Sequence, residues 1–313
     1  MSKTFHSSGD VIADRRVGYA KLLAETSDFA AAADLVSQAL ELAPNWTAGW
    51  DLLGTYHEKS GNLSGAIAAW RQLEALDDEG VFGARLKLAV HGASAAGEGT
   101  AVSYVEALFD QYAPRFESAL VGKLNYQVPN LLDGLINSVM ADTGIIRFER
   151  ALDLGCGTGL MGQRLRDKVD YLEGIDLSGA MIAETNRKRI YDRLEKAELV
   201  HFLQSRPPET ELITAADVFI YCGALPPILA AVVGAMCPGG LLAFSLEEHD
   251  GEEPVFLRPS LRYAHGVNAT RQALIDVGLE LLRFERAILR QDRGAPIAGM
   301  LVVARKPQDR TQI

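Results

Sequence analysis

The sequence predicts an all-α region followed by an α/β domain with a doubly wound, mostly parallel sheet that ends in an antiparallel hairpin. Residues 11–80 read as helices separated by short breaks. From residue 145 onward, short apolar strands alternate with helical stretches, which implies a parallel sheet with helices on both faces. The last two apolar runs, 279–289 and 299–306, are joined by a loop without room for a crossover helix, so we expect a hairpin there.

The composition is that of a soluble globular protein of two domains, with 313 residues, 48% of them hydrophobic and 23% charged. A net charge of −10 disfavours nucleic acid as a partner. The apolar runs are too short to cross a bilayer, and the first residues lack the apolar core of a signal peptide. The odd number of cysteines suits a reducing compartment. We therefore expect a cytoplasmic protein that binds neither nucleic acid nor membrane.

Two halves of the helical region are related by a period of 34 residues, which aligns Ala32 with Ala66. Small residues at such positions are typical of tetratricopeptide repeats, in which two antiparallel helices pack closely. The pattern departs from that family at His57, where an aromatic is usual, and at Asp78, where proline is usual. An unrelated alanine-rich hairpin explains the same spacing. Because two repeats rarely stand alone, we expect residues 1–91 to pack on further helices, on a protein partner or on a second copy.

The glycine-rich stretch 92–100 reads as a linker to an α/β domain over 101–313. Within that domain, the apolar helices of 101–145 are expected to form a lid. The strands of its sheet are expected at Ala151–Leu154, Leu172–Asp176, Leu199–Phe202, Leu212–Ala215 and Leu241–Leu246.

The segment LDLGCGTGLMG, which contains the first expected strand, permits two interpretations. Gly155, Gly157 and Gly159 alternate after Asp153, but Gly157, Gly159 and Gly162 also spell the dinucleotide pattern G-x-G-x-x-G. Either pattern lets a nucleotide-like ligand approach the backbone and a helix N-terminus. A carboxylate directly before the turn would repel a pyrophosphate and attract an ammonium group. Asp153 therefore favours S-adenosylmethionine, which has an amino-acid end and no phosphate, over a nicotinamide dinucleotide.

The motif LDLGCGTG at 152–159, followed by GIDLSGAM at 174–181, resembles the class I S-adenosylmethionine-dependent methyltransferases, a Rossmann-like family, over residues 103–306. With the helical front end and the segments FDQYAPRFE, AADVFIYCG and LRPSLRYAHG, the chain is similar to bacterial predicted methyltransferases that carry N-terminal tetratricopeptide repeats. The resemblance implies a transferase that uses S-adenosyl-L-methionine.

The resemblance also implies roles for individual residues. Asp153 would accept from the amino group of the cofactor, or cap the loop, and Asp176 would bind both ribose hydroxyls. Met181 would pack on the adenine or belong to the core, and the family usually has Asp where this chain has Glu198. The lid tyrosine, Tyr112, would cover the cofactor or belong to the core. The implied cofactor-binding residues are Tyr112, Asp153, Gly155, Cys156, Gly157, Gly159, Asp176, Leu177, Met181, Glu198, Leu199 and Ala215.

Two residues after the fourth expected strand are the catalytic candidates. Asp217 would bind substrate or act as a base, unless it caps a helix, and Tyr221 would touch the substrate. No Asn-Pro-Pro-aromatic sequence, the usual signature of adenine or glutamine amide methylation, occurs here. His249 with its scattered acidic neighbours is weak evidence for a metal, so we expect a solvated loop and no metal site.

An arginine cluster after the fifth expected strand suggests the acceptor. Its residues are Arg258, Arg262, Tyr263 and His265, and arginine forks match carboxylate or phosphate oxygens. Ion pairing with the nearby Gly-Glu-Glu segment is the alternative. The sequence thus predicts methyl transfer to a small acceptor, with an anionic one favoured by the arginines. Methylation of a client protein docked on the repeats, or a cofactor-sensing interaction protein, are the other interpretations.

Overall fold

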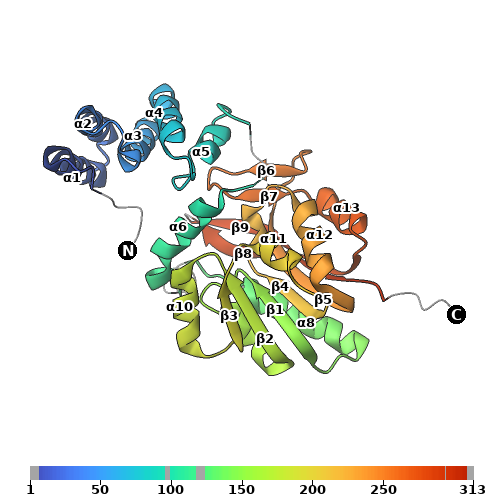
Figure 1. The fold of residues 1–313 in the computed structure, drawn as a ribbon. Coiled ribbons are helices and arrows are strands. Elements are labelled where there is room, and N and C mark those ends of the chain that lie inside the picture. Colours follow the sequence, from blue (N-terminus) through green and yellow to red (C-terminus); the bar gives the residue numbers. More distant parts are fainter. Residues whose placement is uncertain (1–6, 96–98, 118–123, 293, 309–313) are drawn as a thin grey trace. The chain divides into compact units, whose positions relative to one another are not determined.

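The computed structural model describes residues 7–95, 99–117, 124–292 and 294–308 (Figure 1). It divides into a helical unit, residues 1–107 with 259–261, and an α/β unit, residues 108–258 with 262–313. Residues 96–98 of the expected linker and 118–123 of the expected lid lie outside the described residues. Among the described residues, no helix is long and apolar enough to span a membrane.

The helical unit consists of successive antiparallel helices, drawn from dark blue (α1) to teal (α5) in Figure 1. Helix α1 pairs with α2, and α3 with α4, and the unit continues into α5. Ala32 on α2 and Ala66 on α4, one period apart, are both fully buried. A Cβ on Gly54 would collide with the Trp70 ring, so glycine lets α3 and α4 approach closely. The helices are α1 (Val11–Glu25), α2 (Phe29–Leu42), α3 (Thr47–Lys59), α4 (Leu63–Leu76) and α5 (Ala84–Val90).

Polar caps explain where these helices begin. The side chains of Asp10, Asp28 and Asn62 accept hydrogen bonds from backbone N–H groups in the first turns of α1, α2 and α4. Leu88 of α5 joins the buried cluster around Leu73 of α4. The helical pair α3–α4 therefore packs on a further helix, as expected of a short repeat array.

The α/β unit is built on a nine-stranded sheet with the order β3-β2-β1-β4-β5-β7-β6. Strands β1 to β5 are parallel, β9 is antiparallel to β5, and β8 is antiparallel to β9. The strand order reverses between β1 and β4, so ligands are expected at the carboxyl ends of these strands. The strands are β1 (Phe148–Leu154), β2 (Val169–Asp176), β3 (Arg193–Lys196), β4 (Thr210–Ala215), β5 (Met236–Glu248), β6 (Val255–Leu257), β7 (Tyr263–His265), β8 (Glu280–Asp292) and β9 (Ala295–Arg305).

Two hydrophobic clusters include apolar side chains of the sheet strands and of the helices packed on them. One contains residues of α11, α12 and α13, and the other residues of α8 and α9. This is the doubly wound arrangement that alternating strands and helices predict. The remaining helices are α6 (Val102–Tyr112), α8 (Val128–Thr143), α9 (Leu160–Leu165), α10 (Gly179–Lys188), α11 (Leu199–Gln204), α12 (Leu225–Ala235) and α13 (Val267–Asp276).

The strand expected at Leu199–Phe202 is wrong, because these residues begin helix α11. Glu198 caps this helix by accepting hydrogen bonds from the N–H groups of Val200 and His201. The third strand lies earlier, at Arg193–Lys196, where half-buried and exposed residues hide the apolar signal of a strand. The hairpin strands also run further than expected, so that their loop is shorter. The short strands β6 and β7 were not expected.

Candidate active site

The glycine loop between β1 and α9 adopts a conformation that suits glycine. Gly155, Gly157 and Gly159 all have left-handed φ angles, of 58°, 54° and 87°. A Cβ on Gly155 would lie 2.6 Å from the Val218 side chain, whereas Gly157 faces open space apart from Phe116 at 3.9 Å. The N–H of Cys156 donates to the Ile175 carbonyl at 2.9 Å, which ties the loop to β2. The loop therefore presents its backbone at the carboxyl ends of β1 and β2.

Asp153 lies at the end of β1 and is almost completely buried. Its two carboxylate oxygens accept hydrogen bonds from the Thr214 hydroxyl at 2.7 Å and the Tyr191 hydroxyl at 2.6 Å. Burial raises the pKa of Asp153 to about 6, although both hydroxyl donors oppose the rise. Asp153 therefore does not cap the loop with these bonds. It is a buried carboxylate that lines the pocket beside the glycines.

Tyr191, which sequence reasoning missed, fills the space behind this loop. Its ring and hydroxyl occupy the positions where a Cβ on Gly162 would go, and its ring lies 2.8 Å from the position of a Cβ on Gly174. The glycine that completes the dinucleotide pattern is thus required by packing against a tyrosine. No local motif marks Tyr191, because its role is to pack against three glycines from different parts of the chain, Gly159, Gly162 and Gly174.

Asp176 ends β2 and faces the same loop. One carboxylate oxygen accepts from the Gly157 N–H at 2.9 Å and the other from the Ser178 N–H at 2.8 Å. Burial raises the pKa of Asp176 to about 6, and these two hydrogen bonds oppose the rise. The carboxylate is thereby held at the carboxyl edge of β2, where an acidic residue can meet ribose hydroxyls.

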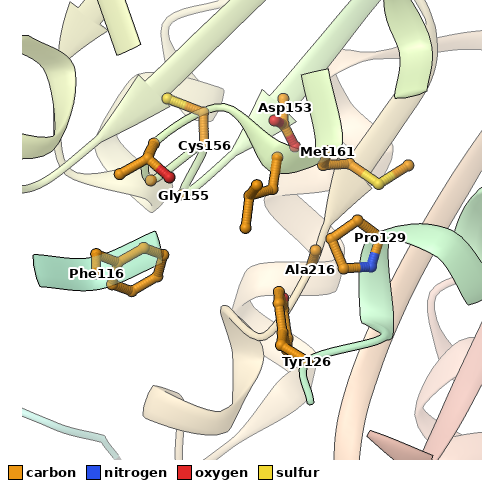
Figure 2. Close-up of a pocket in the computed structure, with 11 residues that line it drawn as sticks. Phe116, Tyr126, Pro129, Asp153, Gly155, Cys156, Met161 and Ala216 are labelled. Atoms are coloured by element: carbon orange, nitrogen blue, oxygen red, sulfur yellow. The ribbon is translucent and has the colours of Figure 1, made fainter. Parts of the chain in front are cut away.

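A pocket opens in front of the loop and has about 320 Å³ of empty space, part of it open to solvent. Figure 2 shows Asp153 and Cys156 on the loop side, with Phe116 and Tyr126 across the pocket from them. Burial and the Asp217 carboxylate raise the pKa of Tyr126, so this phenol stays protonated. Neither aromatic residue was named as a site residue from the sequence.

The end of the lid is joined to the loop region by two acidic side chains. Asp110 of α6 accepts from the Ser178 hydroxyl at 2.6 Å and the Ala180 N–H at 3.3 Å, at the start of α10. Glu117 pairs with Lys188 at the end of the same helix. The lid tyrosine itself, Tyr112, is 46% exposed. The side chains that hold the lid to α10 are thus charged ones.

The residues that are expected near the adenine differ in their burial and in their contacts. Met181 is completely buried in the first turn of α10, while Leu177 is partly exposed. Both carboxylate oxygens of Glu198 accept hydrogen bonds at the N-terminus of α11, which begins at Leu199. These residues all lie close to the carboxyl ends of β2 and β3. Their contact with a cofactor stays a prediction.

Asp217, a predicted catalytic residue, lies two positions after Ala215, the last residue of β4. Asp217 has a left-handed φ of 59°, its N–H donates to the Ser245 hydroxyl at 2.9 Å, and its carboxylate pairs with Arg290 at 2.6 Å. Arg290 is only 3% exposed and also pairs with the buried Glu247. Asp217 does not cap the following 3₁₀ turn, Phe219–Tyr221. It is a strained, ion-paired residue, and its partner Arg290 was missed from the sequence.

Two of the four residues in the predicted substrate cluster are buried, and the other two are arginines that contact polar groups. Tyr263 and His265 are buried in β7, and burial lowers the pKa of His265 to about 4. Arg258 donates to the Glu248 carbonyl at 2.6 Å and pairs with Glu247, not with the Gly-Glu-Glu segment. Arg262 approaches the Tyr221 hydroxyl at 3.4 Å. Among the described residues, no His, Cys, Asp and Glu group has the arrangement of a metal site.

Comparison with known families agrees with this geometry. Residues 152–242, from the end of β1 into β5, match the family model described as a methyltransferase domain. The α/β unit therefore contains a methyltransferase domain, and S-adenosylmethionine is its cofactor. The residues at the glycine loop and at the end of β2 suit the charged and hydroxyl groups of that molecule.

Relatives of known activity are similar over part of the chain. A malonyl-[acyl-carrier protein] O-methyltransferase of Enterobacter lignolyticus is 27% identical over 54% of this chain and 67% of its own length. A trans-aconitate 2-methyltransferase of Pseudomonas paraeruginosa is 37% identical over 30% of this chain, which spans about a third, 34%, of that relative.

Two further similarities concern the helices and the fold. A TPR repeat-containing protein of Pseudomonas aeruginosa is 37% identical over 18% of this chain and 54% of its own length. A solved S-adenosylmethionine-dependent methyltransferase from Clostridium acetobutylicum is 16% identical, covers 64% of this chain and 99% of its own chain, and has a TM-score of 0.47.

Proposed function

We propose that the whole protein transfers the methyl group of S-adenosylmethionine to a carboxylate of a small acceptor. The observation that carries this proposal is how the Asp217 carboxylate is held. This residue lies two positions after the last residue of β4, and the buried Arg290 holds its carboxylate. Both of its carboxylate oxygens are already engaged, one with the Ser245 hydroxyl at 3.2 Å and the other with Arg290 at 2.6 Å. The site therefore suits an acceptor that needs no base, and a carboxylate is already ionised at neutral pH.

In such a reaction a carboxylate oxygen attacks the methyl carbon as the sulfur–carbon bond breaks, and no proton has to be removed. The cofactor supplies the activated methyl group. The residues of this chain then have to orient the acceptor and exclude water, and orientation alone can lower a barrier by about 7–11 kcal/mol. Phe109 of the lid packs its ring edge against Tyr221, with centroids 5.5 Å apart, on the acceptor side. The names of two relatives refer to malonyl and aconitate groups, which are carboxylic acids.

The test is an acceptor screen that measures formation of S-adenosylhomocysteine. Di- and tricarboxylates such as trans-aconitate should support turnover, and their neutral amides should not. Turnover with amines or neutral alcohols, and with no carboxylate, would contradict the proposal. A cell extract separated by size tests the other functions. Turnover only with the protein fraction would indicate a client docked on the repeats, and cofactor binding without any turnover would indicate an interaction protein.

A further inference from the structure

Three arginines on the acceptor side are held with very different strength. Arg290 is 3% exposed and is fixed between Asp217 and Glu247. Arg258 is fixed by its 2.6 Å hydrogen bond to the Glu248 carbonyl and by Glu247 at 3.2 Å. The Arg290 guanidinium is therefore buried between two carboxylates. Arg258 is 31% exposed, but the Glu247 carboxylate lies 3.2 Å from its Nε and would repel a new anion there.

Arg262 is different, because its contacts are long. Its Nε lies 3.4 Å from the Tyr221 hydroxyl and its Nη1 lies 3.6 Å from an Asp292 carboxylate oxygen. Charge-assisted hydrogen bonds between a guanidinium and a carboxylate are usually about 2.7–2.9 Å long. The Arg262 side chain is also 27% exposed. Its planar fork can therefore accept a bidentate carboxylate at a modest cost in lost contacts.

Asp292 is the weakly bound counter-ion of this arginine. It is the last residue of β8, paired with Ala295 at the turn end of the hairpin, and its side chain is 29% exposed. A half-exposed ion pair without a close hydrogen bond contributes little stability. Water can solvate this carboxylate when another anion replaces it on Arg262.

The position of Arg262 relates it to the reacting groups. Tyr221 stands in the loop that follows β4, and its ring packs against Phe109, with centroids 5.5 Å apart. Phe109 in turn packs against Phe116, which lines the pocket in front of the glycine loop, with centroids 6.1 Å apart. An anion on Arg262 would therefore lie next to Tyr221, two ring contacts away from this pocket.

We propose that Arg262 anchors one carboxylate of the acceptor by displacing Asp292, while a second carboxylate of the same molecule is methylated. This inference rests on the proposed function. A carboxylate held by a guanidinium fork is neutralised and fixed, and so is a poor nucleophile, which is why two carboxylates are needed. Asp292 then limits the affinity of the protein for the acceptor, because the acceptor carboxylate has to displace Asp292 from Arg262.

The experiment measures binding of trans-aconitate by calorimetry to full-length protein saturated with S-adenosylhomocysteine, together with kcat and KM for its methylation. Asp292→Asn removes the competitor and should tighten binding by about two- to fivefold, the range of an exposed ion pair. Arg262→Ala should weaken binding by about tenfold or more, and Arg262→Lys should restore part of the loss. These changes should appear mainly in KM.

Asp250→Asn is the matched control, because it removes the same charge from an exposed loop after β5. It should leave trans-aconitate binding unchanged, and all variants should keep the affinity for S-adenosylhomocysteine. If wild type methylates trans-aconitate but Asp292→Asn fails to tighten binding, or Arg262→Ala fails to weaken it, this inference is wrong and the proposed function stands. If wild type neither binds nor methylates any polycarboxylate in the screen, the proposed function fails first.

Discussion

Two buried carboxylates beside the glycine loop, Asp153 and Asp176, differ in the groups that hold them. Asp153 accepts only from side-chain hydroxyls, whereas Asp176 accepts from two backbone N–H groups. The position of Asp176 therefore depends on the fold of the loop, and that of Asp153 depends on Tyr191 and Thr214. A local motif surrounds each acid, so the sequence could predict that both lie beside the glycine loop, and their contact with the cofactor stays a prediction. Tyr191 could not be predicted, because only tertiary packing gives it a role.

Asp176→Ala should weaken binding of S-adenosylmethionine by about 1.5–3 kcal/mol, the usual value of hydrogen bonds to a charged group. The substitution removes the proposed acceptor of the ribose hydroxyls and also the bond that holds the Gly157 N–H. Asp170→Ala at the exposed start of β2 is the control. Calorimetry that shows unchanged affinity in Asp176→Ala would remove the ribose assignment.

The raised pKa of Asp153 predicts a pH dependence of stability. Its pKa of about 6 lies above the unfolded value of 3.8, mainly because of burial, so the native state binds the extra proton between these values. Its contribution to the free energy of unfolding should therefore fall as pH rises through this range. Urea denaturation without cofactor would compare wild type with Asp153→Asn. The wild type should lose stability relative to the variant on going from acidic to neutral pH, and a constant difference would contradict the pKa shift.

At the scale of elements, one arginine joins three of them. Arg290 of β8 reaches Asp217 after β4 and Glu247 at the end of β5. No sequence motif connects these positions, since they are 73 and 43 residues apart from Arg290. Three short strands likewise have no local signal in the sequence. Strand β3 lies at one edge of the sheet, and β7 and β6 lie beyond β5. Long apolar strands were predicted well because burial on both faces leaves a continuous signal.

Arg290→Met should destabilise the protein by about 3–5 kcal/mol at neutral pH, because it removes the cation of Asp217 and leaves the buried Glu247 with Arg258 alone. Arg305→Met is the matched control. Arg305 pairs with Glu280 at the other end of the same hairpin, with side chains 36% and 51% exposed. That pair should contribute only about 0–1 kcal/mol. Chemical denaturation measures the free energy of unfolding of both variants. Equal losses in the two would show that the buried pairs of Arg290 contribute no more than the exposed pair of Arg305.

At the scale of the whole molecule, every described side chain of the candidate site belongs to the α/β unit. The boundary between the units falls inside α6, at residues 107 and 108, and not in the glycine-rich stretch. The division at 92–100 is still our proposal for where the chain can be cut, because a cut there keeps α6 intact. What the helical unit binds is likewise a proposal, with a client protein or a second copy as the partners its repeats suggest.

A truncated protein that starts at Thr100 should retain binding of S-adenosylmethionine with little change in affinity. All the implied cofactor residues follow this position, and α6 remains whole. Calorimetry on the truncated and the full-length protein makes the comparison. A truncated protein that is soluble and folded by circular dichroism, yet does not bind the cofactor, would show that the helical unit contributes to the site.

The placement of β9 has a consequence for how the chain is made. This strand is the last in sequence, yet it lies between β5 and β8 and pairs with both. While the ribosome is still adding residues 295–305, β5 exposes an unpaired edge from Leu241 to Glu247, and β8 has no neighbour. Open apolar edges favour wrong pairing between nascent chains. The sheet can therefore close only after residues 295–305 have been made, and chaperones that shield strand edges should matter most in that interval.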